Sequence, residues 1–531
     1  IETWREPVAK GVWCMVGEFG CANHVAHDDA LRFFESDLRL FRQLKLGWAC
    51  WGFIGSRFGI LNSFRKDVDY EDWEDAKLDR RMLELLRRYA KDLPPVAPMT
   101  ISKTCPRYFE SAGETFVPIG VNLCYCRDRD VRTGYLEWLD RFSANGGNYI
   151  RLWCGNATWD VMPRFDEIDS EAVDRLRWIA DECGKRGIRI KLTLEQFRGF
   201  DKSQPPVFRK EIYAPYAKTM TEWFTNATCQ AAFRRKIDAM AAAVGNHPAV
   251  AVIEIWNEIM GDWGVIQTAW QTETLAYMRK AFPGKLVVAN LGSFSEADSG
   301  LTYDRICARA DNDFLQVHRY YDPGAGMSVC YGPVDFFCAD AIRELLDRRA
   351  DRPALLAEVG AVNPGHTGPS ELYAKDPEGV LMHDMVFAPF FAGAAGCGQM
   401  WHWDSRYVDG NGLWHHYGRF ARAVAGLDPV VEDFRPFRGE SKAYRYYGLC
   451  GRNTTVIWLR DKRVDALAEV RDGKRPEVRT DWKIPMKTGG QVDAYLPWED
   501  RHVTARTEAN KICLPPFRRS VVLRFKTPGV W

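Results

Sequence analysis

The sequence predicts an α/β protein in which a (β/α)8 barrel is followed by a small β-sandwich and preceded by a partial β-α-β-α segment. Two observations lead to this prediction. Strand-like and helix-like segments alternate eight times between about residues 115 and 430, and eight such units fit the size of a (β/α)8 barrel. Beyond residue 432, short alternating segments are separated by turn residues, which is typical of an antiparallel β domain.

Residues 1–93 have the order strand, helix, strand, helix. The expected elements are Gly11–Gly20, Asp28–Leu44, Gly47–Ile54 and Asp79–Tyr89. Such a run cannot bury a parallel sheet by itself. Pro94, Pro95 and Pro98 then predict a linker over 94–114.

The barrel is expected over 115–431. Its strands are predicted at Phe116–Tyr125, Tyr149–Gly155, Ile188–Phe197, Val250–Met260, Lys285–Phe294, Phe314–Tyr321, Pro353–Val362 and Gly396–Trp403. Amphipathic helices are predicted at Glu171–Arg186, Cys229–Val244, Ile266–Phe282, Phe336–Arg349 and Val380–Ala394. The β-sandwich is expected over 432–531, with packing against the barrel favoured over sugar binding as its role.

Composition and motifs exclude several partners. The 72 basic and 71 acidic residues leave a net charge of +1, which argues against nucleic acid or an anionic membrane. No run of 18 apolar residues suggests a membrane span. The 15 cysteines show no paired CxxC spacing, and no dinucleotide or phosphate-binding motif occurs, so neither a metal nor another cofactor is expected. The chain starts with Ile1, so a signal peptide could be missing and the location is left open.

Two apolar strand-like runs each deliver a glutamate to the end of a barrel strand. They are Val252-Ile253-Glu254-Ile255-Trp256-Asn257-Glu258 and Ala354-Leu355-Leu356-Ala357-Glu358-Val359-Gly360. Chemistry in this fold occurs at the carboxyl ends of the strands. A facing pair of carboxylates is what retaining hydrolysis of a glycosidic bond requires, and the 20 tryptophans suit sugar stacking.

These residues resemble the family 5 glycoside hydrolases of clan A over roughly residues 115–430. The resemblance implies that Glu258, after Asn257, is the general acid/base and that Glu358 is the nucleophile. The implied substrate-binding residues are Arg151, Asn257, His318 and Tyr320 (from His318-Arg319-Tyr320), and Trp401, with Trp403 as the competing choice. From its place in Gly120-Val121-Asn122 at the end of the first strand, Asn122 is a further candidate. Many members carry a histidine near the end of strand 3, where this chain has Glu195-Gln196-Phe197.

Residues 1–93 resemble only the last quarter of the catalytic domain of the same family. Gly17-Glu18-Phe19-Gly20 is similar to the nucleophile strand, and Trp48 to Trp51 is similar to strand 8. We expect a longer tandem protein that is truncated at its N-terminus, in which Glu18 has no acid/base partner and is inert. The alternative is a fragment that completes the barrel of another subunit.

The expected function is retaining hydrolysis of β-linked glucose- or mannose-type oligo- or polysaccharides by double displacement. We expect the Glu258 and Glu358 carboxyl groups about 5–5.5 Å apart, and a raised pKa for Glu258, with the charge of Glu358 as one cause. The aromatic segment Phe200 to Phe224 is expected to close one end of the cleft and favour exo-action. The alternatives are a non-catalytic carbohydrate-binding protein and a transglycosidase.

Overall fold

The computed structural model of the 531-residue chain describes residues 7, 10 and 12–527, except 45, 56, 91–95, 260–263, 481 and 509. The chain divides into two compact units, Ile1–Pro94 and Pro95–Trp531. Each unit is described by itself.

The first unit has the expected β-α-β-α order, with a short hairpin inserted before the last helix. Its elements are β1 (Met15–Phe19), α2 (His27–Gln43), β2 (Gly47–Cys50), β3 (Glu71–Trp73), β4 (Ala76–Leu78) and α3 (Arg80–Ala90). Strands β1 and β2 pair in parallel. Large apolar side chains stay in contact with solvent here, with Trp13 75% and Phe64 69% exposed. Glu18 on β1 is also exposed.

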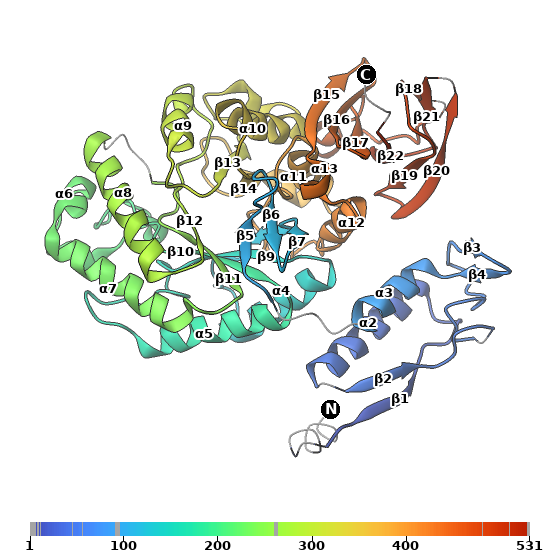
Figure 1. Ribbon diagram of the computed structural model, residues 1–531, viewed down its shortest axis with the longest axis horizontal. Helices are drawn as coiled ribbons and strands as arrows, with labels where there is room; N and C mark the ends of the chain where they lie inside the picture. Colours follow the sequence, from blue (N-terminus) through green and yellow to red (C-terminus); the bar gives the residue numbers. More distant parts are fainter. Residues whose placement is uncertain are drawn as a thin grey trace. The chain divides into compact units, whose positions relative to one another are not determined.

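The second unit opens with a three-stranded antiparallel sheet of β5 (Met99–Ile101), β6 (Phe109–Ser111) and β7 (Glu114–Phe116). Strands β5 and β6 lie within the segment 94–114 that was expected to be a linker. The chain then enters the barrel, where strands lie inside and helices outside (Figure 1).

Seven of the eight expected barrel segments contain a strand. They are β8 (Gly120–Asn122), β9 (Tyr149–Trp153), β10 (Arg189–Thr193), β11 (Val250–Glu254), β12 (Leu286–Val288), β13 (Leu315–Tyr321) and β14 (Ala354–Ala361). The eighth segment closes the ring by bridges from Met400 to Val121 and Val359. Between β12 and β13 the contact includes a hydrogen bond from the Phe294 amide to the His318 carbonyl.

Helices surround the barrel. They are α4 (Val131–Ala144), α5 (Ser170–Lys185), α6 (Met220–Thr225), α7 (Ala227–Val244), α8 (Gly264–Ala281), α9 (Ser299–Ala308), α10 (Val334–Arg348), α11 (Val380–Phe391) and α12 (His415–Val424). Five of them, α5, α7, α8, α10 and α11, form where the apolar periodicity predicts them. Four 3-10 turns join them: η1 (Pro206–Phe208), η2 (Glu211–Tyr213), η3 (Ser328–Tyr331) and η4 (Glu371–Lys375). Asp130, Asp169 and Asn226 cap α4, α5 and α7 by accepting backbone N–H donors of the first turn. Among the helices described, none has the length and apolar character needed to cross a bilayer.

Alternation along β13 explains how the barrel interior becomes polar. Gln316, His318 and Tyr320 point to the interior, whereas Arg319 points outward and binds Asp340 of α10. Every residue of β13 is buried, because one face of the strand meets the barrel interior and the other meets helices. Parallel pairing with β14 places His318 beside Glu358.

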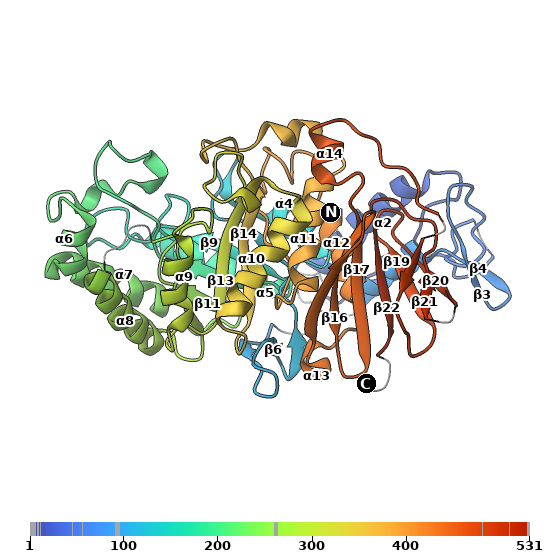
Figure 2. The same cartoon turned by 90° about the horizontal axis from the view of Figure 1, so that it is seen from above.

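The C-terminal part is one curled antiparallel sheet rather than the two separate sheets of the expected sandwich. Its strands are β15 (Arg435–Glu440), β16 (Tyr444–Cys450), β17 (Thr454–Asp461), β18 (Lys483–Pro485), β19 (Val492–Leu496), β20 (Arg501–Glu508), β21 (Lys511–Cys513) and β22 (Ser520–Lys526), with the short helices α13 (Pro429–Glu432) and α14 (Ala466–Val470) before and among them. The strand order is β15-β16-β17-β22-β19-β20-β21-β18, and its central strands lie side by side in Figure 2. The curl encloses an apolar cluster that includes Ile457, Ile512 and Leu523, so one sheet covers a core that two layers were expected to cover.

Candidate active site

The carboxylate of Glu258 lies just beyond the end of β11 and is held by donors from three segments. Its Oε1 is 2.8 Å from His318 Nδ1 and accepts a hydrogen bond of 3.3 Å from Ser293 Oγ. Arg198 Nη2 donates to Oε2 at 2.8 Å. The backbone of Glu258 is left-handed, with φ 48°, a costly conformation for a residue with a side chain. Strained backbone of this kind clusters at functional sites.

The carboxylate of Glu358 comes from β14 and is almost fully buried. Arg151 Nη1 on β9 donates to Oε1 in a close ion pair. The Tyr320 hydroxyl on β13 donates to Oε2 at 2.6 Å. Both oxygens of this carboxylate therefore accept from donors on other barrel strands.

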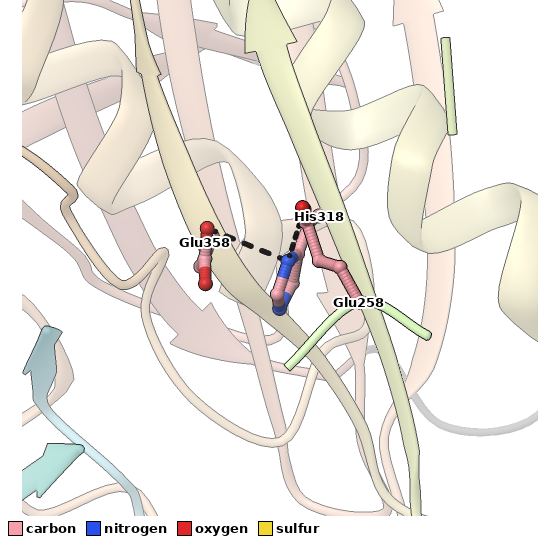
Figure 3. A group of neighbouring side chains, drawn as sticks. All are labelled: Glu258, His318 and Glu358. Atoms are coloured by element: carbon pink, nitrogen blue, oxygen red, sulfur yellow. Dashed lines mark hydrogen bonds and ion pairs between the residues drawn. The ribbon is translucent and has the colours of Figure 1, made fainter. Parts of the chain in front are cut away.

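His318 lies between the two carboxylates (Figure 3). Its Nδ1 is 2.8 Å from Glu258 and 3.4 Å from Glu358, and its Nε2 is 2.9 Å from Asn290 Nδ2. One side-chain oxygen of each glutamate and one His318 nitrogen all lie within 4.8 Å of one another.

That spacing would by itself suit a metal ion. However, the carboxylate oxygens already accept from the guanidinium, phenol and imidazole donors described above, and a metal would have to displace them. These contacts therefore favour two carboxylates that each accept hydrogen bonds from protein donors, and not a metal centre.

A fully polar layer lies inside the barrel beneath the pair. Glu254 at its centre accepts from Arg151 Nε at 2.7 Å and from Gln316 Nε2 at 2.6 Å, and lies 3.3 Å from Lys191 Nζ. Arg151 also donates to Thr193 at 2.9 Å. Since Glu254 and Arg151 are both fully buried, each charge depends on the other.

The electrostatics of this layer separate its titratable groups. Burial raises the pKa of Glu254, but attraction to Arg151 and Lys191 outweighs it and lowers the pKa to about 2. Burial also lowers the pKa of Lys191 to about 8, against the opposing attraction of Glu254. For Tyr320, burial and the charge of Glu358 raise the pKa well above its ordinary value, so its hydroxyl stays a donor.

The expectation of a raised pKa for Glu258 is wrong for the free protein. Burial does raise it, but the hydrogen bond and charge of His318, together with the charges of Arg198 and His366, lower the pKa to about 2. The expected rise considered the negative charge of Glu358. The groups that lower the pKa, His318, Arg198 and His366, come from distant parts of the chain.

The depressed pKa of Glu254 predicts a loss of stability in acid. A carboxyl group with a folded-state pKa near 2 and an unfolded-state pKa of about 4.3 stabilises the fold fully above the unfolded value. That contribution disappears as the pH falls from about 4.3 towards 2. We expect the unfolding temperature of the barrel unit to fall across this range, and more steeply than in Glu254→Gln, followed by calorimetry. Parallel curves for the two proteins would contradict this assignment.

The structure brings most of the sequence-predicted residues together. Asn257 accepts a hydrogen bond of 2.8 Å from Arg151 Nη2 and precedes Glu258. Trp401 is half-buried and packs with its ring centre 4.9 Å from that of Trp153. Trp403 is buried behind it, so Trp401 is the better candidate of the two for stacking on a sugar.

Asn122 bonds to the backbone of the barrel. It is fully buried, and its amide donates to the carbonyls of Ala357 and Gln399 at 3.0 and 3.1 Å. These bonds join the first strand to the last two segments of the barrel. The geometry favours a structural role for Asn122 over contact with a sugar.

Several other tryptophans of the barrel lie in the core. Those buried are Trp153, Trp159, Trp256, Trp403 and Trp414, whereas Trp263 lies outside the described residues. The segment from Phe200 to Phe224 also buries its Phe200, Tyr213 and Trp223 rings, which pack around Phe197. These three rings hold the inserted segment together, so they are not free to line the end of a cleft.

Sequence reasoning missed Arg198, Glu254 and Asn290 as members of the site. Arg198 stands one residue beyond Glu195-Gln196-Phe197, where a family histidine was sought, and it contacts Glu258. The only signal for it was its position just after a barrel strand. Glu254 was visible four residues before Glu258, but its arginine partner is 103 positions away.

The chain is similar to known proteins in sequence and in fold. No family model matches the chain. A mannan endo-1,4-β-mannosidase from Podospora anserina is 24% identical over 262 residues, covering 44% of this chain and 65% of that protein. A probable mannan endo-1,4-β-mannosidase from Neosartorya fischeri is 24% identical over 141 residues, covering 25% of this chain and 28% of that protein. The chain thus spans less than two thirds of the length of these relatives.

Two solved structures resemble most of the chain. One, described as a glycoside hydrolase, has a TM-score of 0.54 at 12% identity and covers 83% of this chain and 100% of its own. A family 5 glycoside hydrolase from Bacteroides vulgatus has a TM-score of 0.51 at 13% identity, with coverage of 82% and 95%. The protein therefore has the fold of the family 5 glycoside hydrolases and is a distant sequence relative of mannan endo-1,4-β-mannosidases.

Proposed function

We propose that the protein is a retaining β-glycoside hydrolase that acts on β-linked mannose- or glucose-type oligo- or polysaccharides. The observation that carries the proposal is the close approach of the Glu258 and Glu358 carboxylates, since one oxygen of each lies within 4.8 Å of the other. Retaining enzymes place the two carboxyl groups about 5–5.5 Å apart, whereas inverting enzymes need about 6.5–9.5 Å to admit a water.

The proposed reaction has two displacements. Glu258 gives a proton to the glycosidic oxygen as the bond from that oxygen to the anomeric carbon breaks, and Glu358 forms a bond to the same carbon. Water then attacks the anomeric carbon, Glu258 takes one proton from it, and Glu358 leaves as a carboxylate. Hydrogen bonds from Arg151 and Tyr320 support the roles of Glu358 as nucleophile and leaving group, because they hold the carboxylate in place on the barrel wall.

The same geometry supports two residues as substrate-binding residues. Asn257 precedes Glu258 and would donate to the sugar 2-hydroxyl, a contact that strengthens in the transition state. The half-buried ring of Trp401 would carry the apolar face of the reacting sugar. Mannose comes first among the candidates because the matched relatives are described as mannan endo-1,4-β-mannosidases.

A hydrolysis panel tests the proposal. We expect turnover of aryl β-mannosides or mannan oligosaccharides ahead of the corresponding glucosides, with the β-anomer as the first product seen by NMR. An α-anomer formed first would contradict retention. Binding of oligosaccharides without turnover by a folded protein would instead favour the non-catalytic carbohydrate-binding alternative, and transfer to sugar acceptors in place of water would favour the transglycosidase.

A further inference from the structure

Arg198 lies in the loop after β10 and is fixed at its backbone. Its amide donates to the Phe208 carbonyl at 2.7 Å, and the Lys210 amide donates to the Gly199 carbonyl at 3.0 Å. The side chain crosses the Phe208 ring, with the guanidinium carbon 3.8 Å from the ring centre, and ends on Glu258 Oε2. The guanidinium therefore has two supports, an aromatic face and a carboxylate.

Both oxygens of Glu258 are occupied in this arrangement. His318 and Ser293 take Oε1, and Arg198 takes Oε2. A general acid must present a protonated oxygen within hydrogen-bond reach of the oxygen that it protonates. An oxygen that faces an N–H donor of a guanidinium cannot do so, and one of the present donors must leave.

Arg198 and His318 differ in their freedom to leave Glu258. His318 is fully buried on β13 and is held from behind by Asn290. The Arg198 side chain is 26% exposed and comes from a loop. Its Nε has no hydrogen-bond partner among the described residues, so the contact with Glu258 is its principal polar anchor.

We propose that Arg198 is a positioning residue that keeps Glu258 ionised in the resting site, and that substrate binding detaches its guanidinium from Glu258. The inference rests on the proposed glycosidase function for its kinetic part. Detachment removes a positive charge from the acid/base, which favours its protonation. The freed guanidinium keeps its place over Phe208 and turns its donors to hydroxyl groups of the substrate.

Charged and titratable groups from several elements face Glu258 and share in its titration. They are Arg198 after β10, Tyr303 of α9, His318 and Tyr320 of β13, Glu358 of β14 and His366 after β14. The pH limits of the reaction therefore belong to the group as a whole. Removal of one nearby cation raises the pH limits of the reaction, whether Glu258 or Glu358 carries the proton.

Kinetics of Arg198→Met test the proposal. In the wild type, the alkaline limb of kcat, which reports the substrate complex, should lie above that of kcat/KM, which reports the free enzyme. In Arg198→Met the limb of kcat/KM should rise by about one pH unit or more and coincide with that of kcat. Arg198→Lys keeps the charge and should stay near the wild type. Arg209→Met is the matched control, since Arg209 is on the same loop and pairs with Glu211.

A rise in KM at an unchanged alkaline limb would overturn the proposal and leave Arg198 with a substrate contact alone. An equal shift of the alkaline limb of kcat/KM in Arg209→Met would also overturn the proposal. The shift would then come from the change in net charge and not from the contact between Arg198 and Glu258.

A second measurement does not depend on turnover. Carbon-13 NMR of labelled glutamate carboxyl groups, with Glu258→Gln to assign the signal, can follow Glu258 in a Glu358→Gln background. Addition of Arg198→Met should raise the pKa of Glu258 by about one unit or more, and an unchanged pKa would refute the resting ion pair. If the wild type hydrolyses no glycoside, the proposed function fails, whereas this titration still decides whether Arg198 controls Glu258.

Discussion

Replacement of Glu358 with alanine should reduce turnover by about 10⁴-fold or more on every substrate, because no other group can form the covalent intermediate. Replacement of Glu258 should act differently. General acid catalysis is worth about 10²–10⁴-fold, and a leaving group that departs without a proton does not need it. Glu258→Ala should therefore be strongly impaired on oligosaccharides, yet form its intermediate readily from a dinitrophenyl β-glycoside.

The two variants are compared by steady-state rates and by the release of dinitrophenol in the first turnover. Glu18→Ala is the matched control, since Glu18 is an exposed glutamate on β1 and is expected to be inert. A Glu358→Ala protein that still releases dinitrophenol at the wild-type rate would remove Glu358 from the nucleophile role. A substantial loss in Glu18→Ala would show that the first unit contributes to activity.

Replacement of Arg151 with methionine should have the largest effect on stability. Arg151 is fully buried and binds Glu254, Glu358 and Asn257. Removal of one partner of a buried ion pair costs about 3–5 kcal/mol, because the remaining charge stays in the interior without compensation. Here two carboxylates lose their guanidinium, and Glu358 also loses a donor needed for its role. We expect a lower unfolding temperature for the barrel unit and a loss of activity.

Calorimetry can measure this effect on the barrel unit. The double variant Arg151→Met/Glu254→Gln should recover part of the lost stability, since the glutamine removes one of the two stranded charges. Arg151→Lys should fall between the wild type and Arg151→Met, because an ammonium keeps the charge but not the planar fork. An Arg151→Met protein that unfolds at the wild-type temperature would show that Lys191 suffices to hold the layer.

Local patterns were enough to predict the barrel strands and the two central carboxylates. Glu258 and Glu358 stand at or near the ends of short apolar runs, and the period-2 pattern of His318-Arg319-Tyr320 places two polar side chains on one face. The eighth strand was predicted in the right place, but only isolated bridges at Met400 form there. The C-terminal strands were also visible from alternation. Their assembly into one curled sheet was not, because pairing partners of a strand are chosen by the whole fold.

The sequence by itself determined the order of elements and the approximate places of the barrel strands, because both depend on neighbours within a few positions. Only the tertiary structure decided which charges meet. Arg198 reaches Glu258 across 60 positions, and Arg151 reaches Glu358 across 207. The hydrogen bond and charge of His318, together with the charges of Arg198 and His366, reverse the expected direction of the Glu258 pKa. A pKa reports the sum of charges and burial in three dimensions, and closure of the barrel is what brings those charges together.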